Sequence, residues 1–243
     1  MRYLLILLLS SLPLVAKAEP KLALIIDDLG YNHHDQIVLS LPQAVTLSIL
    51  PHTPFGAALA ARARQPIMLH LPMQPEGHPA LEKGTLTEQQ SPAQMQHILD
   101  SALADIPEAR GVNNHMGSRL TQDRQRMNWL MTQLARRHLY FVDSRTSAQS
   151  QAMAAAIAAA VPAVERQVFL DNTPASLPKQ WHRALRLARQ HGQVVVIAHP
   201  HPYTLRFLQK ALTQLKGIEL VPVTALLPGQ QLARSGKMAA PRG

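Results

Sequence analysis

The stretch LALIIDDLGY, from Leu22 to Tyr31, decides the fold of this chain. An apolar run of strand length ends in two adjacent carboxylates, Asp27 and Asp28, and a glycine follows, so a buried strand delivers both acids into a turn. In one interpretation, one Asp caps the next helix and the other faces water. In the other, the two like charges need a partner or a cation and mark a metal or acid–base site. The rest of the chain favours the second interpretation.

The first residues predict an export signal. Arg2 gives a positive start, the segment from Tyr3 to Val15 is apolar but short for a membrane span, and Ala16-Lys17-Ala18 has the form of a signal-peptidase site. We expect a signal peptide over residues 1–18, a mature chain that begins near Glu19, and a periplasmic or secreted product without stable membrane insertion. An uncleaved N-terminal anchor is the alternative.

The charge and the absence of cysteine restrict the partners and the source of stability. With no cysteine to form disulfides, stability must come from the core. The formal net charge is +9, and loss of Arg2 and Lys17 leaves 9 − 2 = +7. A basic surface outside the cytoplasm indicates anionic neighbours such as cell-wall polymer, acidic glycans or lipid headgroups, and no aromatic-interleaved basic patch argues for nucleic acid. The composition of residues 229–243 predicts a disordered basic tail.

Short β-rich runs alternate with helical stretches through the mature chain. The runs are Leu22–Asp27, Val45–Leu50, Ile67–Leu71, Gly111–Asn114, Leu139–Asp143, Gln167–Asp171, Val194–Ala198 and, more weakly, Ile218–Val223. The expected helices are Ser91–Ile106 with a capping box, Thr121–Arg137, Ala148–Val161, Leu177–His191 closed by Gly192, and Pro202–Lys216 closed by Gly217.

This alternation predicts a single α/β domain over residues 19–228 with about seven parallel strands. Right-handed crossovers allow a (β/α) barrel or a doubly wound open sheet, and both place their sites at the carboxyl ends of the strands. Polar side chains capable of metal binding or proton transfer stand at nearly every such end: Asp27, Asp28, His52, His70, Asn114, His115, Asp143, Asp171, His199 and His201. Their recurrence at one structural position predicts one shared site.

Three of these residues suit a divalent metal. Asp28, His70 and His115 form an Asp-His-His ligand set of the kind that binds zinc or a similar divalent ion and leaves a position for water. His70 could instead be a core histidine satisfied by the backbone, and His115 could belong to a loop that starts a helix.

The remaining candidates are expected to serve catalysis or substrate binding. Prolines hold His199 and His201 rigidly in IAHPHP, where a histidine can act as general acid or extra ligand. Asp143 and Asp171 can fix an imidazole tautomer, bind substrate or cap a helix, and Arg145 can clamp an anion. Asn114, like its neighbour Asn113, can orient a ligand or form an Asx turn.

Six motifs together carry a family resemblance. They are IIDDLG (25–30), LHLPMQP (69–75), GVNNHMGS (111–118), FVDSRTS (141–147), FLDN (169–172) and IAHPHP (197–202). The set resembles the divergent branch of the polysaccharide deacetylase superfamily and covers nearly all of the mature chain. The resemblance implies a distorted (β/α) barrel with a metal site. It also implies that Asp27 is the catalytic base, Asp28 a metal ligand and His199 the catalytic acid.

The chain departs from the superfamily pattern at two places. Deacetylases of the superfamily usually have His-Ser/Thr-x-x-His-Pro, whereas Gln74 stands here at the second histidine, so His115 would have to complete the site. The usual Arg-x-Pro is also missing, since Thr146 and Ser147 follow Arg145. The leading hypothesis is a metal-dependent hydrolase that removes acetyl groups from a cell-envelope polysaccharide. The alternative is a catalytically inactive barrel that binds envelope glycan or an envelope protein.

Overall fold

A computed structural model describes residues 18–228, so the predicted basic tail and all but the last residue of the predicted signal peptide lie outside the described residues. Within this range the strands are β1 (Lys21–Leu29), β2 (Thr46–Ile49), β3 (Ile67–Met73), β4 (Gly111–Met116), β5 (Tyr140–Asp143), β6 (Ala163–Glu165), β7 (Val168–Phe169), β8 (Gln193–Ala198) and β9 (Glu219–Leu220). They form one sheet in the order β6-β5-β4-β3-β2-β1-β8-β7, with β9 beside β1. Every strand pair is parallel.

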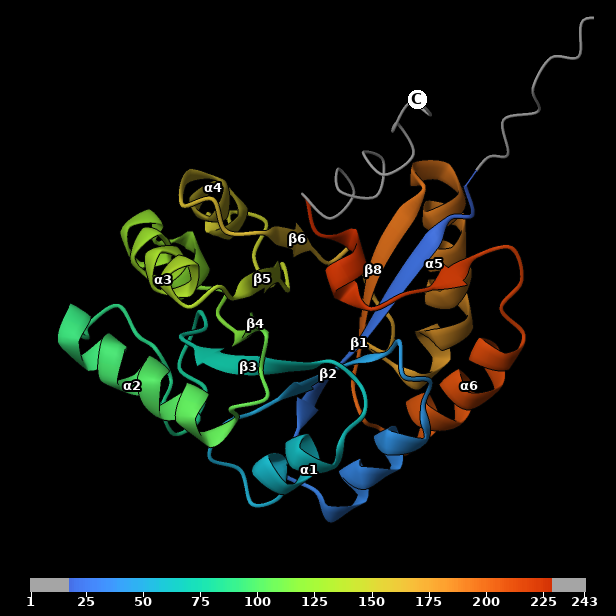
Figure 1. The fold of residues 1–243 in the computed structure, drawn as a ribbon, viewed down its shortest axis with the longest axis horizontal. Helices are drawn as coiled ribbons and strands as arrows, with labels where there is room; N and C mark the ends of the chain where they lie inside the picture. The colour runs from blue at the N-terminus through green and yellow to red at the C-terminus, as the bar shows by residue number, and fades with distance from the viewer. Residues whose placement is uncertain (1–17, 229–243) are drawn as a thin grey trace, which may run out of the picture.

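The sheet curls into a distorted barrel (Figure 1). The segment that contains β6 and β7 closes it. Only Arg166 and Gln167 separate β6 from β7. The backbone N–H of Arg166 donates to the Asp143 carbonyl at 2.9 Å, and that of Gln167 donates to the Val195 carbonyl at 3.0 Å. The first half of the segment therefore pairs with β5 and the second half with β8. Counted as one, β6 and β7 leave seven strands around the barrel besides the short β9, which confirms the predicted parallel barrel.

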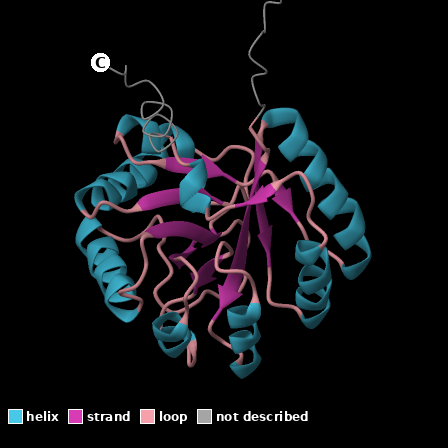
Figure 2. Cartoon of the chain, turned by 45° about the vertical axis from the view of Figure 1, so that its right-hand side comes forward, coloured by secondary structure: helices cyan, strands magenta, loops and turns pink. Residues whose placement is uncertain are grey.

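Six α-helices among the described residues cover the outside of the sheet, as Figure 2 shows. They are α1 (Gly56–Arg62), α2 (Pro92–Asp105), α3 (Arg124–Arg136), α4 (Ala152–Ala158), α5 (Leu177–His191) and α6 (Pro202–Thr213). The predicted capping box of α2 is confirmed, because Ser91 Oγ accepts from the Gln94 N–H and Gln94 Oε1 accepts from the Ser91 N–H. In the part of the chain that the structure describes, no helix is both long and apolar enough to cross a bilayer.

Several boundaries differ from the sequence prediction. The helix expected from Thr121 begins at Arg124, because Asp123 caps it and residues Leu120–Gln122 form a separate 3-10 turn. The helix expected over 148–161 is shorter, and α4 covers only Ala152–Ala158. Before its start, Ser150 Oγ donates a hydrogen bond to the carboxylate of Asp143, so Ser150 lies outside the helix. Helix α1 and the 3-10 helix η1 (His33–Ser40) are additions that periodicity did not indicate.

Two apolar layers fill the two faces of the sheet. Alternate residues such as Leu22, Leu24 and Ile26 of β1 pack outward against the helices, in one large cluster. The opposite set forms a smaller cluster, which includes Ala23 and Ile25 of β1, Met68 of β3, Val142 of β5 and Ile197 of β8. Residues 221–227 join this inner cluster, with the 3-10 helix η4 (Val223–Leu226) packed against β1. The C-terminal segment therefore fills the barrel interior.

The same alternation places the polar residues. On β1 the inner series 23, 25 continues to Asp27, on β3 it runs from Met68 to His70, and on β8 from Ile197 to His199. The interior is thus apolar along most of its length and polar at the carboxyl ends of the strands.

Candidate metal centre

A bulge at the end of β1 aims both acids at the site. The pairing of β1 with β2 shifts register between Ile26 and Leu29, and Asp28 has a positive φ of 58°. Adjacent strand residues ordinarily point to opposite faces, so the bulge is what allows Asp27 and Asp28 to face the same region. Asp tolerates the left-handed conformation better than most residues.

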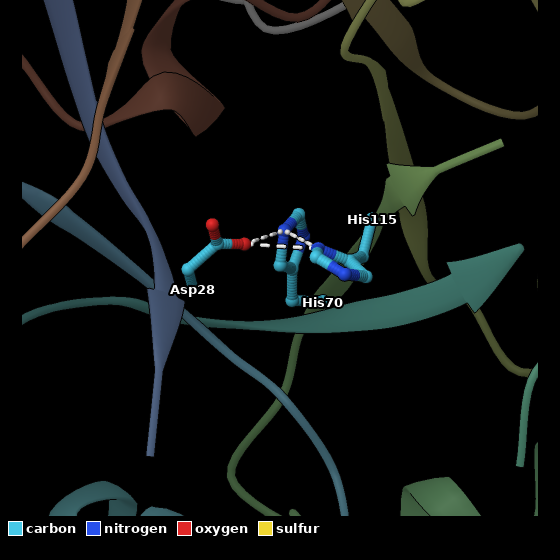
Figure 3. Close-up of side chains that lie close together, drawn as sticks. All are labelled: Asp28, His70 and His115. Carbon is cyan, nitrogen blue, oxygen red and sulfur yellow. Dashed lines mark hydrogen bonds and ion pairs between the residues drawn. The ribbon is translucent and has the colours of Figure 1, made fainter. Parts of the chain in front are cut away.

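Asp28, His70 and His115 converge on one point (Figure 3). Asp28 Oδ1 lies 3.0 Å from His70 Nε2 and 2.9 Å from His115 Nδ1, and these two ring nitrogens are 3.2 Å apart. The three residues come from β1, β3 and β4, and the register Pro72↔His115 brings His115 level with the end of β3. The structure therefore brings together the three residues that the sequence predicted as ligands.

The chemistry of these three atoms fits a cation. His70 Nδ1 lies 2.8 Å from the acceptor Asn113 Oδ1, so Nδ1 carries a ring proton, and in the neutral ring Nε2 presents a lone pair. The Asp28 carboxylate also presents lone pairs, and His115 directs Nδ1 to the same point. Atoms of this kind at about 3 Å spacing repel unless a proton or a metal ion lies between them. Two imidazoles and one carboxylate are a common ligand set of catalytic zinc sites.

Asn113 links the ligand His70 to the acid Asp27. Its Oδ1 accepts from His70 Nδ1 and from Ser48 Oγ, the latter at 2.7 Å. Its Nδ2 donates to Asp27 Oδ1 at 2.9 Å and to Asp27 Oδ2 at 3.0 Å. All four residues are buried, so one amide fixes both the imidazole and the carboxylate. The sequence singled out Asn113 only as a residue that can orient a ligand or form a turn.

The two acids of the pair have opposite electrostatic environments. Burial is the largest influence on Asp27 and raises the pKa of its carboxyl, with the charge of Asp28 adding to the rise. Burial also acts to raise the pKa of Asp28, but hydrogen bonds and charge from His115 and His70 outweigh it and hold that pKa well below its usual range. Asp28 is therefore the fixed anion of the pair, and Asp27 is the acid whose proton affinity is increased.

Asp171 holds His199, whose ring lies near Oδ2 of Asp28, the carboxylate oxygen that His70 and His115 do not contact. Asp171 Oδ1 lies 2.9 Å from His199 Nδ1, and Asp171 Oδ2 accepts from the His199 backbone N–H and from Thr204 Oγ1, both at 2.8 Å. Nδ1 is thereby the protonated donor, while Nε2 lies 3.8 Å from Asp28 Oδ2. Burial lowers the pKa of His199, yet the Asp171 hydrogen bond and nearby carboxylates raise it to about 9.

Phe169 and Arg166 pack in a stack against the ring of His199. The ring of Phe169 stacks on His199 at 5.8 Å, and the guanidinium carbon of Arg166 lies 3.7 Å from the centre of the Phe169 ring. Arg166 also donates to the carbonyls of Ser144 and Arg145. Burial lowers the pKa of Arg166 to about 10. Phe169 belongs to the FLDN motif, but no sequence pattern pointed to its contact with Arg166, because that contact depends on the closing segment.

The other predicted site residues lie around this centre. Asn114 is buried, accepts from the Ser144 N–H and donates to the Met116 carbonyl. Buried Asp143 accepts from the Arg145 N–H and from Ser150 Oγ. Arg145 and His201 are more open: the first is 3.5 Å from Glu165, and the second is exposed and stacks on Tyr203 at 5.0 Å.

Gln74 and His52, which follow β3 and β2, both lie outside the ligand cluster. Gln74 uses its side-chain oxygen to accept from the Glu88 N–H, so it pins the loop after β3. His115 occupies the third position of the cluster from the next strand instead. His52 follows β2 but points away from the cluster, since its ring lies 3.3 Å from Ser101 Oγ of α2 and its N–H donates to Asp105.

Comparison with protein families decides the identity of this barrel. The model of the divergent polysaccharide deacetylase family matches residues 24–227, which span the whole barrel. The chain belongs to the divergent polysaccharide deacetylase family. The resemblance of the six sequence motifs is thereby confirmed.

Two curated proteins and one solved structure resemble most of this chain. The chain is 40% identical over 222 residues to the uncharacterized protein YibQ of Escherichia coli (strain K12), covering 88% of this chain and 70% of that protein. It is 38% identical over 211 residues to an uncharacterized protein of Haemophilus influenzae, covering 84% and 75%. The crystal structure of an uncharacterized protein from Agrobacterium tumefaciens C58 superposes with a TM-score of 0.80 at 26% identity, over 88% of this chain and 92% of that one.

Proposed function

We propose that the protein is a metal-dependent hydrolase that removes acetyl groups from a cell-envelope polysaccharide. The observation that carries the proposal is the convergence of three ligand atoms from Asp28, His70 and His115 beside a separate buried carboxylate, Asp27. A metal ion between the ligand atoms would relieve their repulsion, and a second acid beside a metal site suits hydrolysis. Water adds to the acyl carbon, the C–N or C–O bond breaks, and acetate and an amine or alcohol are released.

Asp28, His70 and His115 would hold the metal, for which zinc is our first candidate because the ligand set is two imidazoles and one carboxylate. When bound, such an ion polarises an acyl oxygen as a Lewis acid. The chain's own contribution is orientation: the Asn113 amide fixes the His70 ring so that its Nε2 faces Asp28.

Asp27 is the general base in this proposal. Its carboxylate lies next to the ligand cluster, with Oδ2 3.8 Å from His70 Nε2. The Asn113 amide holds both carboxylate oxygens, so the group cannot rotate away. Because burial raises the pKa of Asp27, its affinity for a proton from the attacking water is higher than that of an exposed Asp.

His199 is the general acid, and it donates its Nε2 proton to the departing amine or alkoxide. Asp171 keeps Nδ1 protonated and the ring oriented. With a pKa raised to about 9, the imidazole is protonated at neutral pH and can supply that proton.

The surrounding residues divide by their contacts. We assign substrate contact to Arg145 and His201, which are accessible, and positioning roles to Asn114, Asp143 and Asp171, which are buried and bonded internally. A signal peptide over residues 1–18 would direct export of the enzyme, and its cleavage would release the enzyme into the periplasm or medium, where envelope polysaccharide is the available polymer.

The test compares the parent protein with Asp27→Asn, using Asp100→Asn on the surface of α2 as the matched control. Asn keeps the size of Asp27 but cannot accept a proton at neutral pH, so acetate release should fall by roughly two to four powers of ten. Metal content, measured on the same samples, should stay at the parent level. Asp100→Asn should retain parent turnover and metal.

The competing hypothesis is a barrel that binds envelope glycan or an envelope protein without turnover. If the metal-loaded parent releases no acetate from a broad panel of acetylated glycans, the hydrolase proposal is abandoned for the binder. Equal turnover of parent and Asp27→Asn would instead reject Asp27 as the base.

A further inference from the structure

The segment from residue 172 to residue 218 is strongly one-sided in charge. It contains seven lysines and arginines and no aspartate or glutamate: Lys179, Arg183, Arg186, Arg189, Arg206, Lys210 and Lys216. It builds α5 and α6, which lie together on one flank of the barrel (Figure 1). The bounding acids are Asp171, which is engaged by His199, and Glu219 of β9. This flank therefore carries an excess of positive charge.

A groove of about 480 Å³ runs between α5 and α6. Its apolar lining includes Trp181 and Leu185 of α5 and Phe207 of α6, with the rings of Trp181 and Phe207 edge to face at 6.2 Å. Arg189 and Lys210 also line it, as does Lys216 beyond the end of α6. These three basic residues are exposed and take part in none of the ion pairs found among residues 18–228.

The groove has the length of a short helix. Its lining on α5 runs from Pro178 to Arg189, which at 1.5 Å per residue corresponds to roughly 16 Å, or three helical turns. A groove lined by apolar and charged side chains can bind an amphipathic helix by its apolar face. Because the charged residues of the lining are basic, the complementary helix carries acidic residues beside its apolar stripe.

We propose that the groove between α5 and α6 is a docking site for an acidic amphipathic helix of another protein. A flat anionic membrane fits less well, because membrane binding needs apolar side chains that protrude. The exposed large apolar side chains of the described residues are Tyr31, Ile37, Phe55, Leu81 and Ile157, and all lie outside α5 and α6. The chain's own C-terminal tail carries Arg234, Lys237 and Arg242, so its charge has the wrong sign.

The docking site is separate from the metal centre. The ligand residues project from β1, β3 and β4 at the carboxyl ends of the strands, whereas the groove lies between two helices that cover the outer face of the sheet. The inference therefore holds or fails independently of the proposed hydrolase activity.

The first experiment finds the partner by site-specific photo-crosslinking. A photoreactive residue replaces Gln214, which lines the groove and is exposed, in living cells that produce the full chain. The same residue at Gln125, exposed on α3, is the matched control. We expect a crosslink to a second protein at position 214 only, and mass spectrometry should map it to a segment with acidic residues and an apolar stripe at helical spacing.

The second experiment measures binding of that segment as a synthetic peptide to purified protein. Combined Arg189→Glu, Lys210→Glu and Lys216→Glu should weaken binding at least tenfold, and so should higher salt. The control combination of Arg62→Glu, Arg64→Glu and Arg136→Glu changes three exposed bases elsewhere and should stay within twofold. Circular dichroism and the midpoint of urea denaturation verify that each variant is folded.

Three results would overturn the proposal. One is no crosslink at position 214 above the level at 125. Another is a crosslink to a second copy of this chain, which would make the flank a self-association surface. The third is charge-dependent binding to vesicles containing phosphatidylglycerol without a protein crosslink, which would make it a membrane surface.

Discussion

At the scale of single residues, the site depends on how one amide distributes its hydrogen bonds. The Asn113 oxygen accepts hydrogen bonds from Ser48 and His70, and its nitrogen donates hydrogen bonds to both oxygens of Asp27. This arrangement fixes the amide orientation, the tautomer of His70 and the position of Asp27 at once. In the proposed mechanism, Asn113 is thus the residue that would position both the metal ligand His70 and the base Asp27.

Replacement of Asn113 by Ala should affect stability and metal binding together. It leaves Asp27, His70 and Ser48 without their buried partner, which should cost about 1–3 kcal/mol in the free energy of unfolding. Metal affinity should fall by roughly 10–100-fold, as loss of an outer hydrogen bond to a ligand does. Urea denaturation and metal titration measure the two effects. Asn128→Ala on the exposed side of α3 is the control, and an Asn113→Ala protein with parent metal affinity would contradict the positioning role.

Replacement of His115 by Ala tests the ligand set. Removal of one of three protein ligands should reduce metal affinity by more than the roughly 100-fold that an outer hydrogen bond contributes. The same loss is expected for Asp28→Ala and His70→Ala. Elemental analysis after dialysis provides the readout, and His97→Ala on the exposed face of α2 should keep its metal. Full occupancy in the His115 variant would move the third ligand to another residue, with His199 the next candidate.

At the scale of elements, the positions of β4 and β5 are set by close packing inside the barrel. Gly111 pairs with Tyr140 across the two strands. A Cβ at residue 111 would lie 2.3 Å from the Tyr140 ring, so a side chain there cannot be accommodated without movement. Because β4 also carries Asn113 and His115, its register against β5 positions two site residues.

Gly111→Ala should therefore destabilise the fold by about 1–3 kcal/mol, the usual cost of overpacking a core. The Tyr140→Leu background removes the ring, and there the cost of Gly111→Ala should fall to less than half. A double-mutant cycle by chemical denaturation gives the coupling between the two positions. Strictly additive costs would show that the Tyr140 ring is not the obstacle.

At the scale of the whole molecule, the last described residues, 221–227, complete the barrel interior. Val223 and Leu226 are buried in the inner cluster, with Ala23 and Ile25 of the first strand. The two ends of the described chain thus meet beneath the metal centre, and the support of the site depends on contacts between residues about 200 positions apart.

Leu226→Ala tests this closure. Leu226 is 1% exposed, so its truncation should cost about 2–5 kcal/mol in the free energy of unfolding. Ile157 of α4 is 75% exposed, and Ile157→Ala should change stability by no more than about 0.5 kcal/mol. Midpoints of urea denaturation compare the two variants. Similar midpoints would argue that residues 221–227 do not contribute to the core.

The sequence by itself determined the alternation of parallel strands and helices and the three residues that cluster at their carboxyl ends. This alternation allows a barrel or an open sheet, and the barrel followed from the resemblance of the six motifs. Strand and helix periods are local properties, and the rule that parallel strands present their carboxyl ends together needs no coordinates. That is why Asp28, His70 and His115, far apart in the chain, were predicted to meet. The inner series on β1, β3 and β8 follows from the two-residue period of a strand in the same way.

Only the tertiary structure decided the features that depend on register, bulges and closure. Three such features are the bulge at Asp28, the hydrogen bonds of Asn113 and the contact of His52 with α2. Each depends on which residues face each other across elements. The contact of Arg166 with the Phe169 ring depends on where the segment of β6 and β7 joins β5 to β8. A local pattern fixes the face on which a side chain lies, but its partner is set by packing between segments distant in sequence, which a single period does not encode.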